Sequence, residues 1–181
     1  KYGYACVGNI IEVGAKVESS WIGRKIFCFH PHVSHFTAPI ADLIAIPEGI
    51  AMKDAVFLPN METAVNLAQD GKPIVGERVV ILGQGVVGLL LADLLSRYPL
   101  ASLTSFDKDK DRREWSKQAG VANVFAPGKL TLNELSTVSD ADLIYEVSGQ
   151  PEALNLAIEL AGFSSRIVLG SWYGTKSAKV E

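Results

Sequence analysis

The spacing of hydrophobic residues changes near residue 70 and divides the chain into two parts. Before that point, short apolar runs rich in Val, Ile and Phe are cut by glycine and polar turns. Such runs between turn signals favour β-strands over helices. We therefore expect a β-rich module whose strands fall within the runs Val7–Val13, Arg24–Phe29 and Phe36–Ile46.

A helical rhythm follows this module. Apolar residues recur at helical spacing between Met52 and Gln69, and Pro59 interrupts them. Because proline lacks a backbone donor and clashes with the preceding turn of a helix, the pattern predicts either one broken helix or two short ones.

Strand and helix patterns alternate from residue 71 onward. Short apolar runs are separated there by longer segments with helical periodicity. This alternation is typical of βαβ units, so we expect an α/β fold with a doubly wound parallel sheet and right-handed crossovers. The predicted strands are Val79–Leu82, Ser102–Phe106, Ala141–Val147 and Arg166–Leu169, and the predicted helices are Val86–Tyr98, Lys108–Gln118 and Pro151–Ala161.

A glycine-rich turn lies between the first of these strands and the helix that follows it. Gly83, Gly85 and Gly88 form the pattern G-x-G-x-x-G. In this pattern the first glycine permits a tight turn, the second lets a pyrophosphate approach the backbone, and the third lets the helix lie close to the strand. The start of the helix also offers N–H groups and the positive end of its dipole to a phosphate. The predicted cofactor residues of this turn are Gly83, Gln84, Gly85, Val86, Val87 and Gly88.

An acidic residue stands at the expected distance from this turn. Asp107 ends the second strand, 19 residues after Gly88, where a carboxylate would bind the adenosine ribose. A carboxylate accepts hydrogen bonds from ribose hydroxyls and repels a 2′-phosphate, so the sequence favours NAD over NADP. Lys108, Lys110 and Arg112 could tolerate a phosphate there, or they are solvated helix charges. The alternative is a glycine-rich turn that binds nothing, with Asp107 as a surface carboxylate.

Two further strand ends are expected to complete the cofactor site. Ligands of open α/β sheets bind at the carboxyl ends of parallel strands. Val147, Ser148 and Gly149 follow the third predicted strand, and Gly170 follows the fourth. The predicted contacts outside the glycine-rich turn are therefore Asp107, Lys108, Val147, Ser148, Gly149 and Gly170.

Composition and charge exclude several classes of protein. The 181 residues carry 17 Lys and Arg against 20 Asp and Glu, a net charge of −3, and 48% of them are hydrophobic. This balance argues for a globular protein with a core, and against an electrostatic grip on nucleic acid or a polybasic membrane anchor. No uninterrupted apolar run reaches the length of about 18 residues that a membrane span needs, so we expect no membrane partner.

The cysteines indicate the redox environment of the protein, and the first residue bears on whether the chain is complete. Cys6 and Cys28 are too few for a disulfide framework, which favours a reduced, cytoplasmic environment. The chain opens at Lys1, directly in patterned sequence and without an initiator methionine or the layout of a signal peptide. We therefore expect a truncated chain.

These segments together resemble the medium-chain dehydrogenase/reductase family, the zinc-type alcohol dehydrogenases and their relatives. The resemblance extends in order over nearly the whole chain. Within the family, GYACVG followed by FCFHPHVSHF is most similar to the branch that includes bacteriochlorophyllide dehydrogenase. The segments that carry the resemblance are GYACVGNIIEVG at 3–14, WIGRKIF at 21–27, IPEGI at 46–50, PIVGERVVILGQGVVG at 73–88 and DLIYEVSGQPEAL at 142–154.

The resemblance implies two domains, with substrate and nicotinamide meeting in the cleft between them. Residues 1–70 would be part of a GroES-like β-barrel catalytic domain with its connecting helix, and residues 71–181 an NAD-binding Rossmann domain without its last strand. About half of the catalytic domain would be missing. The resemblance further implies NAD as the cofactor, a small alcohol or carbonyl compound as the substrate, and pairing of Rossmann domains into a homodimer.

Two positions depart from the pattern of the zinc enzymes. The family's Gly-His-Glu segment aligns with Gly3, Tyr4 and Ala5, so Tyr4 replaces a histidine that binds the catalytic zinc. A later zinc ligand of the family aligns with Pro59, ahead of Thr63. A catalytic zinc site needs three protein ligands and an open position. The resemblance, with these departures, therefore implies no catalytic zinc at the usual place.

A different set of metal ligands is an alternative. His30, His32 and His35 lie close together in the segment FHPHVSH, and imidazoles bind zinc and other transition metals. On an extended strand His30 and His32 point to one side and His35 to the other, so a joint site needs a bend after Pro31. The other interpretation is that this segment lines the active-site cleft with polar side chains.

The leading hypothesis is an oxidoreductase that transfers a hydride between NAD(H) and an alcohol or carbonyl carbon. Without the usual zinc, the developing alkoxide needs a hydrogen-bond donor or a general acid. The rivals are a non-catalytic or degenerate dinucleotide-binding protein and a metal-dependent dehydrogenase that uses the three histidines. The candidate catalytic residues are Tyr4, Thr63, His32 and His35.

Overall fold

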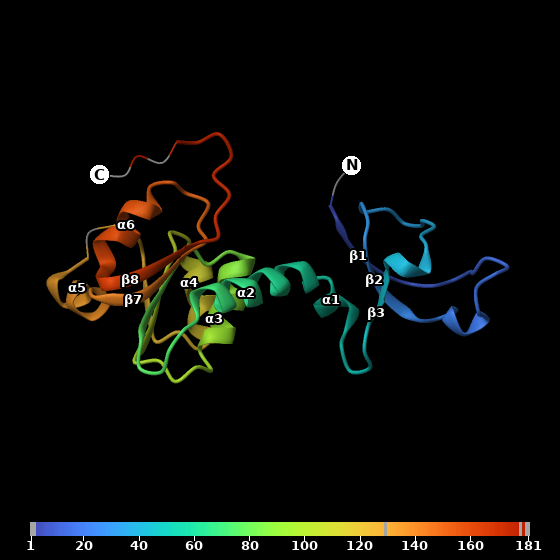
Figure 1. Ribbon diagram of the computed structural model, residues 1–181, viewed down its shortest axis with the longest axis horizontal. Coiled ribbons are helices and arrows are strands. Elements are labelled where there is room, and N and C mark those ends of the chain that lie inside the picture. The colour runs from blue at the N-terminus through green and yellow to red at the C-terminus, as the bar shows by residue number, and fades with distance from the viewer. Residues whose placement is uncertain (1–2, 129, 178, 180–181) are drawn as a thin grey trace. The chain divides into compact units, whose positions relative to one another are not determined.

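The computed structural model describes residues 3–128, 130–177 and 179, and they form two compact units (Figure 1). The first unit ends at Pro59 and the second begins at Asn60. The division predicted at residue 70 instead places residues 60–70 in the first part of the chain. In the structure they form most of a helix whose side chains pack into the core of the second unit. The division at residue 70 stays a prediction for the domains of the whole protein.

The first unit is built on a small antiparallel sheet with the strand order β1-β2-β3. Its central strand carries three buried hydrophobic residues, Ile26, Phe27 and Cys28, and Cys6 of β1 lies directly opposite Cys28. The sheet confirms the β-rich module and agrees with part of a GroES-like barrel. The elements are β1 (Ala5–Asn9), η1 (Ser19–Trp21), β2 (Lys25–Phe29), η2 (Ile40–Asp42), β3 (Leu43–Ala45) and α1 (Met52–Ala55).

The second unit contains a parallel sheet of five strands in the order β6-β5-β4-β7-β8. The central strand β4 pairs with β5 on one side and with β7 on the other. This order confirms the predicted α/β fold with a Rossmann sheet. The strands are β4 (Arg78–Leu82), β5 (Ser102–Phe106), β6 (Asn123–Phe125), β7 (Ala141–Glu146) and β8 (Ala161–Leu169).

Helices cover both faces of this sheet (Figure 1). Side chains alternate between the faces of a strand, and β4 accordingly places Val79 and Ile81 in one buried cluster and Val80 and Leu82 in another. The first cluster is closed by α2 and α3, and the second by α5 and α6. The helices are α2 (Leu58–Gly71), α3 (Val86–Leu95), α4 (Lys110–Gln118), α5 (Leu132–Val138) and α6 (Ala153–Leu160).

Several element boundaries differ from the predictions for physical reasons. The rhythm from Met52 to Gln69 forms two helices, with Pro59 in the first turn of the second, where its missing donor costs nothing. Helix α4 begins at Lys110 because the Asp109 side chain accepts hydrogen bonds from the first turn. Strand β6 and helix α5 were not predicted. Both are short, and a single turn of pattern carries little signal.

The end of helix α3 and the start of strand β8 also differ from the predictions. Helix α3 stops at Leu95 rather than Tyr98, and the Ser96 side chain donates to the carbonyl of Asp93 at this end. Strand β8 begins at Ala161, five residues before the predicted Arg166, and its pairing with β7 shifts register there. Within the described residues, no helix is both long and apolar enough to cross a membrane.

Candidate functional site

The carboxyl ends of β4, β5 and β7 surround a cavity of about 660 Å³ in the second unit. These strands lie side by side, with β4 in the middle, at the point where the chain switches from one half of the sheet to the other. Ligands of open α/β sheets bind at this kind of switch point. The predicted cofactor residues that line the cavity are Gly83, Gly85, Asp107, Lys108, Val147 and Ser148.

Gly83 turns the chain where β4 ends. Its φ angle of +101° is one that L side chains rarely adopt, and a Cβ there would lie 2.6 Å from the Cα of Ser148. Its N–H donates to the carbonyl of Phe106 on β5. Only glycine therefore fits at this position, and the turn packs directly against the loop after β7.

Gly88 and Gly85 play different parts in the same turn. A Cβ on Gly88 would lie 2.1 Å from the carbonyl oxygen of Gly83, so the third glycine lets α3 approach the turn. A Cβ on Gly85 would meet no described atom within 4 Å. The helix ladder starts with the bond from Leu89 N to Gly85 O, so the N–H groups of the first helical residues, Val86 and Val87 among them, have no acceptor within the helix.

Asp107 fixes the turn from the neighbouring strand. Its carboxylate is buried, and its two oxygens accept hydrogen bonds from Gln84 N at 2.7 Å and Asp109 N at 2.8 Å. The Arg112 guanidinium lies 3.9 Å away and also lines the cavity. A carboxylate has about four acceptor positions. Asp107 can therefore hold the turn and still accept ribose hydroxyls, while the exposed Lys108 lies at the rim.

Gln84 is buried behind the turn rather than facing the cavity. Its side chain is fully buried, its Nε2 donates to Gly83 O, and its Oε1 has no partner among the described atoms. Val86, at the start of α3, is 41% exposed. The structure therefore brings Gly83, Gly85 and Asp107 to the cavity itself, whereas Gln84 and Gly88 support them from behind.

The loop after β7 and the loop after β8 are joined by hydrogen bonds. Gly149 N donates to the Ser171 hydroxyl at 2.8 Å, and Gly170 N donates to the carbonyl of Glu146 at 2.9 Å. Gly149 and Gly170 are thus neighbours of the cavity wall that Val147 and Ser148 form. Their contribution as cofactor contacts stays a prediction.

Sequence reasoning missed two residues that organise these loops. Glu146 is fully buried at the end of β7, and Tyr173 donates a hydrogen bond to its carboxylate. Burial and this hydrogen bond both raise the pKa of the Tyr173 phenol. The sequence held one weak signal: Glu146 follows the apolar residues 143–145 of a predicted buried strand, where a carboxylate is rare unless its charge is paired.

The first unit contains three of the four candidate catalytic residues. Tyr4 is 59% exposed. The His32 ring nitrogen Nε2 lies 3.0 Å from the carbonyl of Ala5, and a Cβ on Gly3 would lie 2.2 Å from the same nitrogen. His32 therefore packs against the backbone on both sides of Tyr4. Thr63 is exposed on α2 in the second unit.

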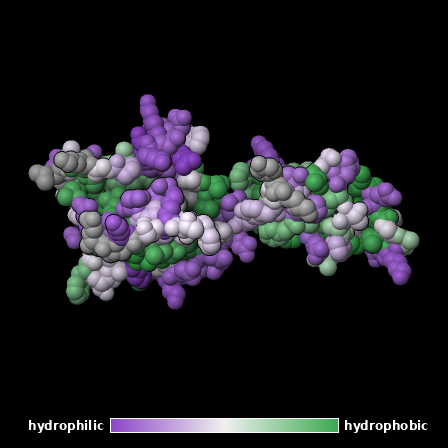
Figure 2. Space-filling model, turned by 90° about the horizontal axis from the view of Figure 1, so that it is seen from above, coloured by the Kyte–Doolittle hydropathy of each residue, from purple (hydrophilic) through white to green (hydrophobic). Residues whose placement is uncertain are grey.

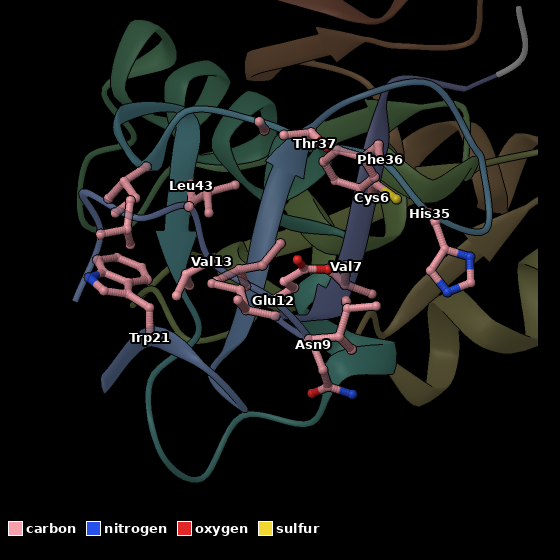
Figure 3. Close-up of a pocket in the computed structure, with 18 of the residues that line it drawn as sticks. Cys6, Val7, Asn9, Glu12, Val13, Trp21, His35, Phe36, Thr37 and Leu43 are labelled. Carbon is pink, nitrogen blue, oxygen red and sulfur yellow. The ribbon is translucent and has the colours of Figure 1, made fainter. Parts of the chain in front are cut away.

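The three histidines of FHPHVSH are engaged separately. The His30 ring stacks on Phe36 with 4.0 Å between centroids, and His32 contacts Ala5. His35 lines a cavity of about 870 Å³ within the first unit, where Figure 3 shows it near Cys6 and away from Trp21. Among the described residues, no group of three or more His, Cys, Asp or Glu side chains could hold a metal ion. The alternative of a joint histidine metal site has no support in this arrangement.

Comparison with curated proteins gives distant relatives of consistent kind. The chain is 23% identical to L-threonine 3-dehydrogenase of Legionella pneumophila and 28% identical to the starvation-sensing protein RspB of Escherichia coli. Each match covers 92% of this chain and 59% of the relative, so the chain spans about three fifths of their length. No family model matches the chain.

Solved structures resemble nearly the whole chain. An alcohol dehydrogenase, RspB of Escherichia coli CFT073 in complex with NADH, has a TM-score of 0.79 at 22% identity, covering 97% of this chain and 61% of that protein. A zinc-binding dehydrogenase of Sinorhizobium meliloti 1021 bound to NADP has a TM-score of 0.80 at 16% identity, covering 97% and 62%. At these identities the likeness establishes the fold.

Proposed function

Because the homologues and structural neighbours of this chain are zinc-type medium-chain alcohol dehydrogenases, we propose that the whole protein is an oxidoreductase that transfers a hydride between NAD(H) and a small alcohol or carbonyl compound. The second unit would hold the cofactor. The observation that carries the proposal is the cavity at which the glycine-rich turn, the start of α3 and the Asp107 carboxylate meet. The narrower bacteriochlorophyllide branch stays a prediction from the sequence.

The glycine-rich turn suits a pyrophosphate. The space in front of Gly85 holds no described atom within 4 Å of a Cβ position, so phosphate oxygens can approach the backbone. The first N–H groups of α3 lie beside this space, and they and the helix dipole favour a negative charge. Gly83 and Gly88 keep the turn and the helix close enough to present these groups together.

Asp107 favours NAD over NADP. The remaining lone pairs of its carboxylate can accept the two adenosine ribose hydroxyls, whereas a 2′-phosphate would bring a second negative charge against a buried one. Arg112, 3.9 Å from Asp107, partly offsets this repulsion. We therefore propose a preference for NAD, with NADP bound more weakly rather than excluded.

The catalytic step needs a proton donor from the protein. A bound nicotinamide supplies the hydride chemistry, and in the direction of carbonyl reduction a side chain must donate a proton to the developing alkoxide. We propose Tyr4 for this role, with His32, His35 and Thr63 as alternatives. No step is assigned to zinc, because Tyr4 and Pro59 stand where the resemblance places two of its ligands.

The proposal extends to the setting of the enzyme. The two free cysteines support a cytoplasmic location. Pairing of Rossmann domains into a homodimer is proposed from the resemblance alone. The rival hypothesis is a dinucleotide-binding protein without activity. It differs from the proposed oxidoreductase only in predicting that no substrate is turned over.

Cofactor titration tests the proposal. We expect calorimetry to show saturable binding of NADH to the chain and weaker binding of NADPH. The Asp107→Asn variant removes the charge, so the ratio of NADPH to NADH dissociation constants should fall about tenfold, the equivalent of roughly 1.4 kcal/mol. Damage to the turn would weaken both dinucleotides alike, which makes this ratio the informative quantity.

Asp109→Asn is the matched control. Asp109 is an exposed helix cap two residues away and does not line the cavity, and asparagine caps helices as well as aspartate does. We expect its dissociation constants to equal those of the unmodified chain. Failure of the unmodified chain to bind either dinucleotide would refute the proposal. Binding without turnover of a panel of alcohols by the whole protein would favour the non-catalytic rival.

A further inference from the structure

A fully buried carboxylate closes the end of β7. Glu146 has no exposed surface, and burying an ionised carboxylate is costly unless its oxygens are paired. Both oxygens are paired here. Oε1 accepts from the backbone N–H of Ser148 at 2.8 Å and from its hydroxyl at 2.5 Å, and Oε2 accepts from the Tyr173 hydroxyl at 2.5 Å.

The backbone of the same residue joins the same two loops. The carbonyl of Glu146 accepts from Gly170 N at 2.9 Å and from the Ser171 hydroxyl at 3.4 Å. The Ser171 hydroxyl in turn accepts from Gly149 N. Glu146 therefore ties the loop 147–149 to the loop 170–173 through its side chain and its main chain.

These loops form one wall of the proposed cofactor site. Val147 and Ser148 line the cavity, and the glycine-rich turn at Gly83 packs so closely on Ser148 that a Cβ would lie 2.6 Å from its Cα. A shift of the loop 147–149 would change the space beside the turn. The wall is held by Glu146, which does not itself line the cavity.

The strand order separates this wall from the ribose-binding carboxylate. Asp107 follows β5 on one side of β4, whereas Glu146 ends β7 on the other side. A dinucleotide in such a sheet crosses the switch point, with its two halves over opposite sides. If Asp107 holds the adenosine ribose, the nicotinamide half lies over β7 and β8.

We propose that Glu146 is a positioning residue for the nicotinamide half of the dinucleotide, acting through Ser148 and Tyr173, which it holds in place. The inference rests on the proposed function. At neutral pH Tyr173 stays protonated, since burial and the bond to Glu146 raise its pKa.

Two ligands that share the adenosine half can distinguish a role of Glu146 in positioning the nicotinamide from a general role in stabilising the fold. NADH contains the nicotinamide, and ADP-ribose lacks it. We expect Glu146→Gln to raise the dissociation constant of NADH about tenfold and that of ADP-ribose less than twofold, because the amide loses a charge-assisted acceptor on the nicotinamide side only. Tyr173→Phe should give the same split, because it removes the donor and keeps the carboxylate.

Ser148→Ala and Glu159→Gln complete the design. Ser148→Ala deletes one hydroxyl bond to Glu146 and keeps the buried charge paired with Tyr173, so it remains informative should Glu146→Gln fail to fold. Its NADH binding should weaken by less than that of Tyr173→Phe. Glu159 is an exposed residue of α6 away from the cavity lining, and Glu159→Gln should leave both dissociation constants unchanged.

The outcomes distinguish failure of the positioning role of Glu146 from failure of the proposed cofactor site. Equal weakening of NADH and ADP-ribose in Glu146→Gln and Tyr173→Phe would mean that Glu146 serves the fold alone, and would overturn the inference while leaving the proposed function intact. Unchanged NADH binding in both variants would overturn it as well. If the unmodified chain binds neither NADH nor ADP-ribose, the proposed cofactor site fails and the inference fails with it.

Discussion

The two units of this chain differ in how much of their structure is held by burial. Two buried clusters on opposite faces of the parallel sheet anchor the second unit, and helices close both. In the described part of the first unit, Ile26, Phe27 and Cys28 of one strand are the buried hydrophobic residues, and Figure 2 shows hydrophobic residues left on its surface. The described part of the first unit therefore buries much less apolar surface than the second unit does.

This difference decides which parts of the site are fixed. The turn at Gly83 is held by contacts with backbone atoms of neighbouring strands, so its geometry follows from the core beneath it. Tyr4 and His35 stand on the less buried unit and are exposed. The contrast teaches that the geometry of the proposed cofactor site follows from the fold of the second unit, whereas the candidate catalytic residues Tyr4 and His35 stand exposed on a unit with a small buried core.

The largest effect should come from the cores themselves. Leu91 on α3 is fully buried and Ile44 on β3 is 48% exposed. Leu91→Ala should lower the free energy of unfolding of the second unit by about 2–5 kcal/mol, and Ile44→Ala should cost less than about 1 kcal/mol. Hydrogen exchange measured by peptide mass spectrometry assigns each loss to a unit. Comparable losses for the two variants would contradict the contrast.

The same contrast can be tested with one substitution made in both units. Gly88→Ala places a methyl group 2.1 Å from the carbonyl oxygen of Gly83, whereas a Cβ on Gly8 of β1 meets no described atom within 4 Å. We expect Gly88→Ala to cost about 1–3 kcal/mol by denaturant unfolding, and Gly8→Ala to be neutral or slightly stabilising.

Gly85→Ala sharpens this comparison within the second unit. Its added methyl also meets no described atom, so stability should stay unchanged while NADH binding is lost to a clash with the pyrophosphate. If Gly85→Ala binds NADH as tightly as the unmodified chain, the phosphate does not rest where we place it.

The parts of the fold that were predicted from the sequence are those with strong periodicity. Strand β4 falls at Arg78–Leu82, within one residue of the predicted Val79–Leu82, because buried parallel strands are short apolar runs between clear turns. Strand β6 and helix α5 were missed, since Asn123–Phe125 and Leu132–Val138 are too short to show a period. The pattern T-x-x-E at Thr131–Glu134 was a local signal for the start of α5 that the reading of periodicity passed over.

The candidate site likewise contains residues that the sequence predicted and residues that it did not. The glycine spacing predicted Gly83, Gly85 and Asp107 at one cavity, because each has a task that few other residues can perform. The buried pair of Glu146 and Tyr173 could not be found from spacing. The two residues lie 27 positions apart and meet only because β7 and β8 are neighbours in the sheet.

A smaller effect should appear in acid, where helix caps matter. Thr131 and Glu134 form a capping box on α5, and hydrogen bonds from the Thr131 backbone and hydroxyl lower the pKa of Glu134 below its ordinary 4.5. A lowered pKa in the folded state contributes stability above the unfolded pKa, and that contribution is lost as pH falls through the folded one. Thr131→Ala should therefore destabilise the second unit at pH 7, and the difference should shrink below pH 4.5.

Denaturant unfolding at several pH values measures this effect. Ser136→Ala is the control, since its hydroxyl bonds the carbonyl of Asn133 on the same helix and involves no titrating group, so its effect should not vary with pH. The described helices of the first unit have no side-chain cap at Glu18, Pro39 or Ala51. Exchange rates there should consequently be insensitive to Thr131→Ala. A cap effect that stays constant into acid would show that Glu134 is not the group involved.

The smallest expected effect concerns the one buried patch of the first unit. Cys28 is 2% exposed and Cys6 is partly exposed on the strand opposite. Burial, with smaller contributions from Asp42 and Cys6, raises the pKa of the Cys28 thiol, and a thiol reacts through its thiolate. In the Cys6→Ser variant, alkylation of Cys28 at pH 8 should be at least roughly tenfold slower than alkylation of Cys6 in the Cys28→Ser variant. Neither rate should change when NADH is added, because the proposed cofactor site lies in the other unit. Equal rates for the two thiols would mean that the small core of β2 opens as readily as the surface, which would make the first unit even less fixed than its burial indicates.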